Sequence, residues 1–350
     1  MRSGMAYLGS HPTRSTVMTT NTLMTALRFD EPGAPLALVR VPRPRPAAGE
    51  VLVKIVAAGI NPLDTKIRAG QAGHARQPAP SILALDMAGI VESVGEGVEG
   101  FAPGDAVYGM TGGVGGHPGA LAQYVAADAM LLAHAPKALP LADVAALPLG
   151  FITAWEGLVD RADLSPGQTL LVHGGAGGVG SMAVQLGVSL GARVVATGSG
   201  SQRSIIESFG AAFADYRDTP IAALVDLHTG GEGFDAVYDT LGGATLDASF
   251  AAARRYGGHV VSSLGWGTHA LAPLSFRAAT YSGVFTLLPL LTGKGFENHG
   301  RIMAEATRLA DAGKLRPVLS ARRFTLEDGN AALDLVESGR AAGKVIVDIA

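Results

Sequence analysis

The residue pattern that most directly implies chemistry is a glycine motif, Gly175-x-Gly177-x-x-Gly180. It follows a short apolar run at 169–173 that is typical of a buried parallel strand, and it opens a helical pattern. One glycine of such a turn permits a tight bend, one lets the backbone approach a pyrophosphate, and one lets the helix pack on the strand. The helix N-terminus offers N–H groups and a positive dipole end to phosphates. The motif predicts a dinucleotide site, with a purely structural glycine turn as the alternative.

The second strand of this unit, predicted at 193–197, ends without the carboxylate that usually binds the ribose 2′-hydroxyl of NAD. Ser199 and Arg203 follow instead. Hydroxyls and a guanidinium suit a 2′-phosphate, so the sequence favours NADPH over NADH. The alternative for Arg203 is a solvated residue on the next helix.

A second candidate site is the polar turn GINPLDTKIRAG at 59–70, after a predicted strand at 50–58. The Asn61 amide and the Lys66 ammonium are suited to holding a substrate oxygen. Ordinary turn chemistry, with Asp64 capping a short helix, is the alternative. The residues alone leave both interpretations open.

The nine histidines and the absence of cysteine limit the other chemistries. Disulfides, a thiol nucleophile and cysteine-ligated zinc are excluded, and no histidine pair has metal-binding spacing. We therefore expect no metal, and we expect a cytoplasmic protein. No G-x-S-x-G elbow supports a serine hydrolase.

The 350 residues predict two domains, and the net charge of −3 without a basic block argues against nucleic-acid binding. The apolar stretches at 142–159 and 281–291 are interrupted by proline or glutamate, so no membrane span is expected. Residues 1–23 have no continuous apolar segment and are expected to be a disordered leader or an upstream start.

Residues 24–148 read as short strands with Gly/Pro turns, which is typical of a small β barrel. From 149 to 315 strands alternate with helices, which predicts a doubly wound parallel sheet. The segment 316–350 ends in a strand that we expect to return to the first domain. Two strand ends in the second domain, at 239–243 and 262–265, are candidate ligand positions or simple turns.

Several segments, taken together and in order from Met24 to Ala350, resemble the zinc-independent quinone oxidoreductase branch of the medium-chain dehydrogenase/reductase superfamily. They are AAGINPLDTKIRAG, ALDMAGIVESVGEGVEGFAPGDAVYG, LPLGFITAWEGL, LVHGGAGGVGSMAVQLGVSLGARVVAT, VYDTLGG and GKVIVDI. Zinc-containing members carry a cysteine where this chain has Asn61 and a His-Glu pair where it has Leu85-Asp86.

The resemblance implies an α/β fold with a GroES-like β-rich catalytic domain at 24–148, completed by 316–350, and a Rossmann cofactor domain at 149–315. It also implies a homodimer. It further implies NADPH-dependent reduction of quinones or of the C=C bond of α,β-unsaturated carbonyls, which are the expected small-molecule partners.

The resemblance also implies site residues. Asn61 and Thr153 match positions near the nicotinamide, and Asn61 also matches one near the substrate oxygen. The remaining matches are Gly177, Gly178 and Val179 for the pyrophosphate, Ser199, Arg203 and Tyr216 for the 2′-phosphate and adenosine, Leu241, Leu264 and Phe285 for the cleft lining, and Lys344 beside the cofactor.

One position departs from the branch. Many of its quinone reductases have tyrosine where this chain has Lys66, and a lysine is more similar to enone-reductase-like relatives, which favours an enone or enal substrate. A zinc-free alcohol-dehydrogenase-like enzyme is a rival, disfavoured because nothing activates the hydroxyl. A second rival is a non-enzymatic NADPH-binding protein, such as a redox sensor or a crystallin. The glycine motif does not distinguish it from an enzyme, because both would bind the cofactor through this motif.

Overall fold

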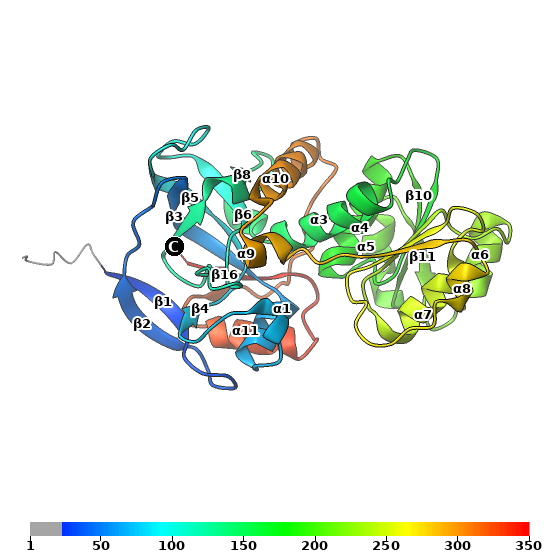
Figure 1. The fold of residues 1–350 in the computed structure, drawn as a ribbon, viewed down its shortest axis with the longest axis horizontal. Coiled ribbons are helices and arrows are strands. Elements are labelled where there is room, and N and C mark those ends of the chain that lie inside the picture. The colour runs from blue at the N-terminus through cyan, green and yellow to red at the C-terminus, as the bar shows by residue number, and fades with distance from the viewer. Residues whose placement is uncertain (1–22, 350) are drawn as a thin grey trace, which may run out of the picture.

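The computed structural model describes residues 23–349, which form two lobes side by side (Figure 1). Residues 1–22 and 350 lie outside the described residues, and with them all of the expected leader except Leu23, which begins the first strand. One lobe, here the β-rich lobe, contains both ends of the described chain, and the other, the parallel-sheet lobe, contains the glycine motif.

The β-rich lobe is built on two sheets. Its strands are β1 (Leu23–Phe29), β2 (Ala37–Pro42), β3 (Glu50–Ile60), β4 (Ser81–Ile82), β5 (Asp86–Val94), β6 (Ala106–Met110), β7 (Tyr124–Asp128), β8 (Leu132–His134), β15 (Phe324–Thr325) and β16 (Val345–Asp348). The larger sheet has the order β15-β16-β3-β5-β6-β8, with β7 also paired to β3, and the smaller has the order β2-β1-β4. Strand β16 pairs antiparallel with β3, as expected of the C-terminal segment.

Short helices close this lobe. They are α1 (Pro62–Arg68), η2 (Gly73–Ala75), η3 (Ala129–Leu131), α2 (Leu141–Val144), α10 (Phe296–Asp311) and α11 (Gly329–Glu337). Helix α10 precedes residue 315 in the chain, yet it packs on β6 and β8 (Figure 1). The Tyr108 hydroxyl donates to the Met303 carbonyl (2.8 Å), and the Thr307 hydroxyl donates to that of His134 (2.7 Å). The helix that follows the parallel sheet thus covers the other lobe.

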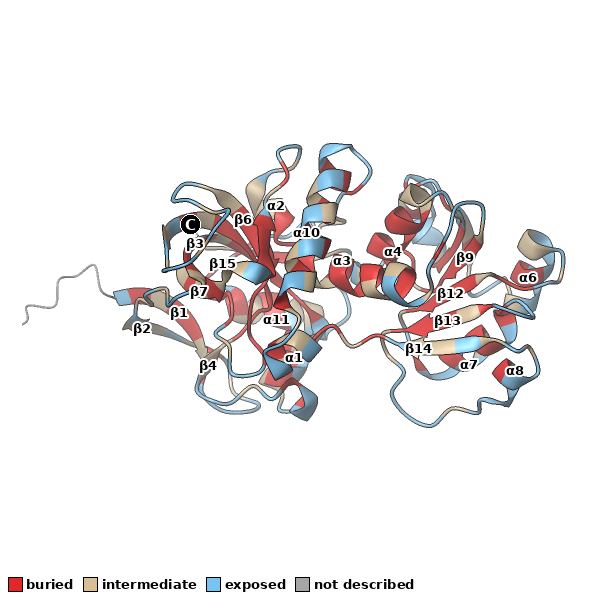
Figure 2. Ribbon diagram, turned by 45° about the horizontal axis from the view of Figure 1, so that its top comes forward, coloured by how far each residue is buried: buried red, intermediate tan, exposed pale blue. Residues whose placement is uncertain are grey.

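The parallel-sheet lobe has six strands with helices on both faces (Figure 2). The strands are β9 (Thr169–Val172), β10 (Arg193–Gly198), β11 (Ala212–Asp215), β12 (Ala236–Asp239), β13 (His259–Ser262) and β14 (Thr280–Gly283). The helices are α4 (Gly178–Ser189), η5 (Gly200–Gln202), α5 (Arg203–Glu207), α6 (Ile221–Thr229), α7 (Gly243–Ala252) and α8 (Ala272–Ser275). Helix α9 (Leu288–Thr292) follows β14 but lies against the β-rich lobe (Figure 1), where His117 Nε2 is 3.1 Å from the Leu290 carbonyl oxygen.

The order β11-β10-β9-β12-β13-β14, with every pair parallel, is the 3-2-1-4-5-6 order of a dinucleotide-binding sheet. All residues of β9 and β12 are buried, because helices cover both faces of a parallel sheet. The predicted α/β fold class is confirmed. The order reverses between β9 and β12, where such sheets bind their ligands.

Helix α3 (Pro148–Trp155) lies between the lobes and continues directly into a π-helical turn, η4 (Glu156–Arg161) (Figures 1 and 2). Seven of the eight residues of α3 are buried, so both lobes pack around this helix. A π-helical turn shifts the side chains that follow it around the helix axis, and such turns are frequent at functional sites.

Candidate functional site

The glycine loop joins β9 to α4. The tight turn is made by Gly174, whose φ of +71° lies in the left-handed region. Gly180 lets the helix approach the strand, because a Cβ there would lie 2.0 Å from the Gly174 carbonyl oxygen. Gly175 faces the neighbouring strand, where its Cβ would lie 2.6 Å from the Cβ of Ala196. The motif therefore supplies the close packing, while the bend falls one residue before it.

The N-terminus of α4 is the part of this loop that can receive a ligand. Gly177 is the N-cap residue, and no side chain of the described residues caps the helix. The first N–H groups of a helix have no partner within it. A Cβ at Gly178 would meet no atom within 4 Å, so the space in front of it is open. Val179, the next residue, is half-buried. Open space at an uncapped helix N-terminus fits a pyrophosphate.

Ser199 and Tyr216, predicted to contact the adenosine side of the cofactor, both lie at the carboxyl end of β10. Ser199 caps η5 through a capping box with Gln202. The Tyr216 N–H donates to the Gly198 carbonyl (3.3 Å), and the Tyr216 side chain is exposed. Parallel pairing of β10 with β11 thus brings two positions distant in sequence to one strand end.

Arg203 provides a cation at the same strand end. Its guanidinium pairs with Glu207 (3.1 Å), one helical turn further on, and lies 4.4 Å from the centre of the Phe213 ring. The side chain is 58% exposed. An exposed i,i+4 pair contributes little, so the guanidinium can exchange Glu207 for a phosphate at small cost.

The sequence interpretation missed one carboxylate near this point. Asp215 ends β11 and is the register partner of Gly198. Its Oδ1 accepts the Arg217 N–H (3.0 Å), and its Oδ2 lies 3.2 Å from where a Cβ of Gly200 would stand. The rule that places an acidic residue after the second strand of the unit did not find it, because Asp215 is at the end of the third strand.

The predicted turn after β12 is organised by Asp239, which is fully buried. Its Oδ1 accepts the Leu241 N–H (3.2 Å), and its Oδ2 accepts the Ser262 hydroxyl (2.7 Å). A Cβ at Gly242 would lie 2.4 Å from the Leu264 carbonyl oxygen. The ends of β12 and β13 are therefore joined, and Leu241 is left exposed beside the glycine loop.

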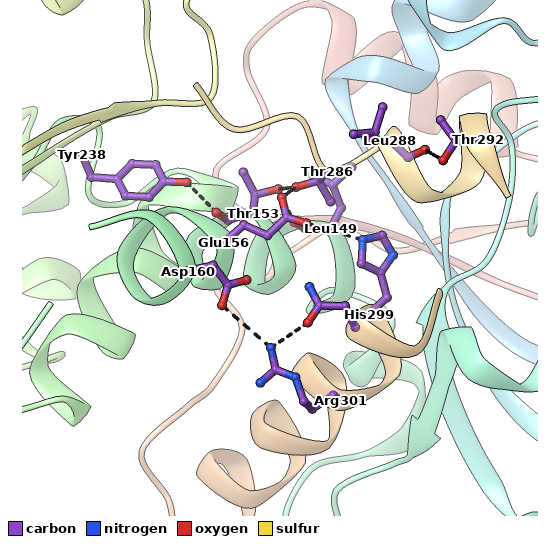
Figure 3. Close-up of polar contacts among 11 residues, drawn as sticks. Leu149, Thr153, Glu156, Asp160, Tyr238, Thr286, Leu288, Thr292, His299 and Arg301 are labelled. Atoms are coloured by element: carbon purple, nitrogen blue, oxygen red, sulfur yellow. Dashed lines mark hydrogen bonds and ion pairs between the residues drawn. The ribbon is translucent and has the colours of Figure 1, made fainter. Parts of the chain in front are cut away.

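A buried polar cluster surrounds Thr153 (Figure 3). The Thr153 hydroxyl donates to the Leu149 carbonyl (2.6 Å) and lies 3.2 Å from the Thr286 hydroxyl, which donates to Glu156 Oε2 (2.9 Å). The Tyr238 hydroxyl donates to the Thr153 carbonyl (2.6 Å). The cluster fixes Thr153 from both the parallel sheet and the segment after β14.

His299, fully buried on α10, adds a third element to this cluster. Its Nε2 lies 3.7 Å from Glu156 Oε1, and neither ring nitrogen has a hydrogen-bond partner within residues 23–349. Phe285, a predicted cleft residue, immediately precedes Thr286 and is half-buried. Sequence reasoning missed Glu156, Thr286 and His299, since Glu156 stood out only as a charge interrupting an apolar run.

Asn61, the predicted residue of the polar turn, lies where three strands meet. Register pairs Val345 with Ile60, so Lys344, one residue before β16, lies beside Asn61, one residue after β3. Asn61 Nδ2 donates to Asp86 Oδ2 (2.9 Å). Lys344 Nζ donates to Asn61 Oδ1 and to Asp86 Oδ2 (2.8 Å for the latter). We call Asn61, Asp86 and Lys344 the buried triad.

The triad is removed from solvent. The Asp86 side chain is fully buried and that of Lys344 is 9% exposed. The lysine reaches Asp86 by passing over Gly59, where a Cβ would lie 3.0 Å from Lys344 Cε. A buried ion pair of this kind needs its hydrogen bonds, because each ion has lost its hydration.

Asp64 and Lys66 both lie on α1, but Asp64 is buried and Lys66 is exposed. Asp64 forms a capping box with Asn61, whose N–H it accepts at 2.8 Å. Burial, with a further contribution from the charge of Asp86, raises the pKa of the Asp64 carboxyl to about 7. Lys66 is exposed, and its ammonium forms no hydrogen bond or ion pair within the described residues. Its catalytic role stays a prediction, and the lysine that contacts Asn61 is Lys344.

Helix α3 connects the buried triad to the glycine loop. The Leu149 N–H, in its first turn, donates to Asp86 Oδ1 (2.9 Å). A Cβ at Gly150 would lie 2.8 Å from the Gly178 carbonyl oxygen. Adjacent residues of one helix therefore contact the triad on one side and the glycine loop on the other, and Thr153 follows one turn later. The two candidate sites therefore lie on either side of this helix.

Among residues 23–349, no three His, Asp or Glu side chains gather as metal ligands. The helices of this part of the chain include none with both the length and the apolar character of a bilayer span.

Two family models match the chain. One, described as an alcohol dehydrogenase GroES-like domain, matches residues 47–137, and the other, described as a zinc-binding dehydrogenase, matches residues 209–347. The two matched segments lie in the β-rich lobe and, from residue 209, across the parallel-sheet lobe to β16.

Two curated relatives and one solved structure are similar over most of the chain. A 2-methylene-furan-3-one reductase of Solanum lycopersicum is 35% identical over 306 residues, which cover 85% of this chain and 71% of the relative. A chloroplastic NADPH-dependent alkenal/one oxidoreductase of Arabidopsis thaliana is 33% identical over 306 residues, with 85% and 72% covered. The crystal structure of an alcohol dehydrogenase superfamily protein from Novosphingobium aromaticivorans is 51% identical, with a TM-score of 0.91 over 93% of this chain and 100% of that one.

Proposed function

The chain belongs to the medium-chain dehydrogenase/reductase superfamily, in its zinc-independent quinone and enone reductase branch, and we propose that it uses NADPH to reduce quinones or the C=C bond of α,β-unsaturated carbonyl compounds. The observation that carries this proposal is the pair of contacts made by α3. Leu149 binds Asp86 of the buried triad and Gly150 packs against Gly178 of the glycine loop. A dinucleotide on that loop would be held close to the triad.

The glycine loop and α4 would hold the pyrophosphate, and Thr153 would lie on the nicotinamide side. Bound there, NADPH would supply a hydride. The rest of the work is orientation and charge stabilisation by the chain's own groups. The Thr153 cluster serves orientation, because Thr286, Glu156 and Tyr238 fix α3 where it faces the nicotinamide position.

Charge stabilisation falls to the buried triad. As a conjugated carbonyl is reduced, negative charge develops on its oxygen, which then needs hydrogen-bond donors. The Asn61 amide has two N–H groups and the Lys344 ammonium has three. Within the triad Asn61 uses one and Lys344 uses two. One donor is left on each, and both residues are almost entirely buried.

We propose NADPH rather than NADH on the strength of Arg203 and Ser199 at the end of β10, although Asp215 lies close by. The Asp215 carboxylate already accepts the Arg217 N–H, whereas the exposed Arg203 guanidinium forms a surface pair with Glu207 and packs on the Phe213 ring. A 2′-phosphate would therefore meet an exposed cation at Arg203 and, at Asp215, a carboxylate that already accepts a hydrogen bond.

The experiment that tests this function is a screen for NADPH oxidation with quinones, 2-enals and enones, followed by identification of the product. We expect turnover with members of these classes and saturation of the C=C bond in the enones. We also expect a kcat/KM at least about tenfold higher with NADPH than with NADH, since hydrogen bonds to charged groups contribute about 1.5–3 kcal/mol. No turnover with any of the three classes would contradict the proposal.

Two arginines of the parallel-sheet lobe provide a matched pair for the cofactor part of this test. Arg203→Ala should remove most of the preference for NADPH. Arg193→Ala, at the opposite end of β10, should leave the preference unchanged. Equal use of both cofactors by the unaltered protein would remove the role given to Arg203.

We also propose that the protein is a homodimer formed through β14. This strand is at the edge of its sheet and half-exposed, so one side of its backbone is unpaired within residues 23–349. An open edge strand is a template for pairing with another copy. Light scattering should give the mass of two chains, and a single-chain mass at micromolar concentration would contradict the interface.

A further inference from the structure

Three aromatic side chains form a cluster to which both lobes contribute. His74 comes from η2 of the β-rich lobe, Trp266 from the loop after β13, and Phe285 from the segment after β14. The centres of the His74 and Trp266 rings are 5.1 Å apart with 36° between their planes, and those of Trp266 and Phe285 are 6.3 Å apart and nearly perpendicular. We call these three residues the aromatic bridge.

The aromatic bridge lies beside the proposed hydride site. Trp266 follows β13 by four residues, and Leu264 in the same loop packs its carbonyl against Gly242 at the end of β12. Ligands of such sheets bind at these carboxyl ends. Phe285 directly precedes Thr286, which is part of the Thr153 cluster (Figure 3). The peptide bond between Phe285 and Thr286 therefore joins the aromatic bridge to the Thr153 cluster, on the nicotinamide side of the proposed site.

The indole of Trp266 remains available to a ligand. Trp266 is 56% exposed even though the His74 ring lies against the indole and the Phe285 ring is nearly perpendicular to it. An exposed aromatic face beside a reaction site attracts flat π systems, which gain offset-stacking energy beyond the area they bury. Short alkyl groups gain only the burial term. The exposed indole of Trp266 should therefore favour substrates that carry a flat aromatic ring over substrates that carry a short alkyl group.

We propose that Trp266 determines substrate specificity, by stacking on an aromatic ring conjugated to the C=C bond of the substrate. The preferred class is then aryl-substituted enones over enones with short alkyl groups. This inference rests on the proposed reductase function, which supplies the C=C bond to be reduced. The ring would bind on the indole while the carbonyl oxygen faces the donors of Asn61 and Lys344.

Two substrates that differ only at the β-carbon test this inference, 4-phenyl-3-buten-2-one and 3-penten-2-one. Trp266→Ala should lower kcat/KM for the phenyl enone by about tenfold and for the methyl enone by less than about twofold. Phe276→Ala is the matched control, since Phe276 is also exposed but precedes β14, at the amino end of the sheet. It should change neither value. Equal losses for both enones in Trp266→Ala would overturn the inference.

A binding measurement separates this inference from the proposed function. The chain has two tryptophans, so Trp155→Phe leaves Trp266 as the only indole. Titration of this variant with the phenyl enone, in the presence of NADP⁺ so that no turnover occurs, should quench its fluorescence more than the methyl enone does. Unquenched fluorescence at concentrations that saturate turnover would overturn the stacking. Quenching without NADPH oxidation would support the stacking site while the reductase function fails.

Discussion

Lys344→Met is expected to lower the free energy of unfolding by about 3–5 kcal/mol, the cost of leaving one member of a buried ion pair without its partner. The Asp86 side chain is fully buried, and Lys344 is its only cationic partner in the described chain. Methionine keeps most of the length of the lysine stem, so the change removes the charge and two hydrogen bonds but little packing. Chemical denaturation followed by circular dichroism gives the difference.

Lys137→Met is the matched control, because Lys137 is exposed and surface substitutions usually change stability by no more than about 0.5 kcal/mol. Adding Asp86→Asn to Lys344→Met should restore part of the loss, since no charge is then left buried. If Lys344→Met unfolds at the same denaturant concentration as the unaltered protein, the triad is not a coupled ion pair.

Local patterns predicted the fold and the position of the glycine loop. The strand, glycine turn and helix around 169–190 form one continuous unit, and the alternation of strands and helices beyond it implied the parallel sheet that is observed. The residue that makes the bend could not be chosen in advance. Five of the seven residues from Gly174 to Gly180 are glycine. The predicted motif comprises Gly175, Gly177 and Gly180, whereas Gly174, just before it, takes the positive φ.

Contacts between distant segments explain what the sequence did not reveal. Asn61 was grouped with Lys66 because they are five residues apart, but Lys66 points to solvent from α1. The lysine that reaches Asn61 is 283 residues away and is brought there by the pairing of β16 with β3. Asp215 was missed for the same reason, since the pairing of β10 with β11 places it beside Gly198. Strand register, which no local pattern reports, decides both.

The second large effect concerns two glycines of the glycine loop, which we expect to respond in opposite ways to the same substitution. Gly180→Ala should destabilise the protein by about 1–3 kcal/mol or more, because its Cβ would stand 2.0 Å from the Gly174 carbonyl oxygen and the backbone would have to move. Gly178→Ala meets nothing within 4 Å. It should leave stability unchanged or raise it by up to about 1 kcal/mol, because alanine is the better helix former.

The effect of Gly178→Ala on dinucleotide affinity should differ from its effect on stability. The open space at Gly178 is where a pyrophosphate would approach the N-terminus of α4. Gly178→Ala should therefore weaken NADPH binding at least about tenfold in a protein that melts normally, a loss of about 1.4 kcal/mol. Thermal melts and titration of the NADPH fluorescence measure the two quantities on one sample. If Gly178→Ala binds NADPH as tightly as the unaltered protein, the glycine loop is a structural turn, and the cofactor would have to be placed elsewhere.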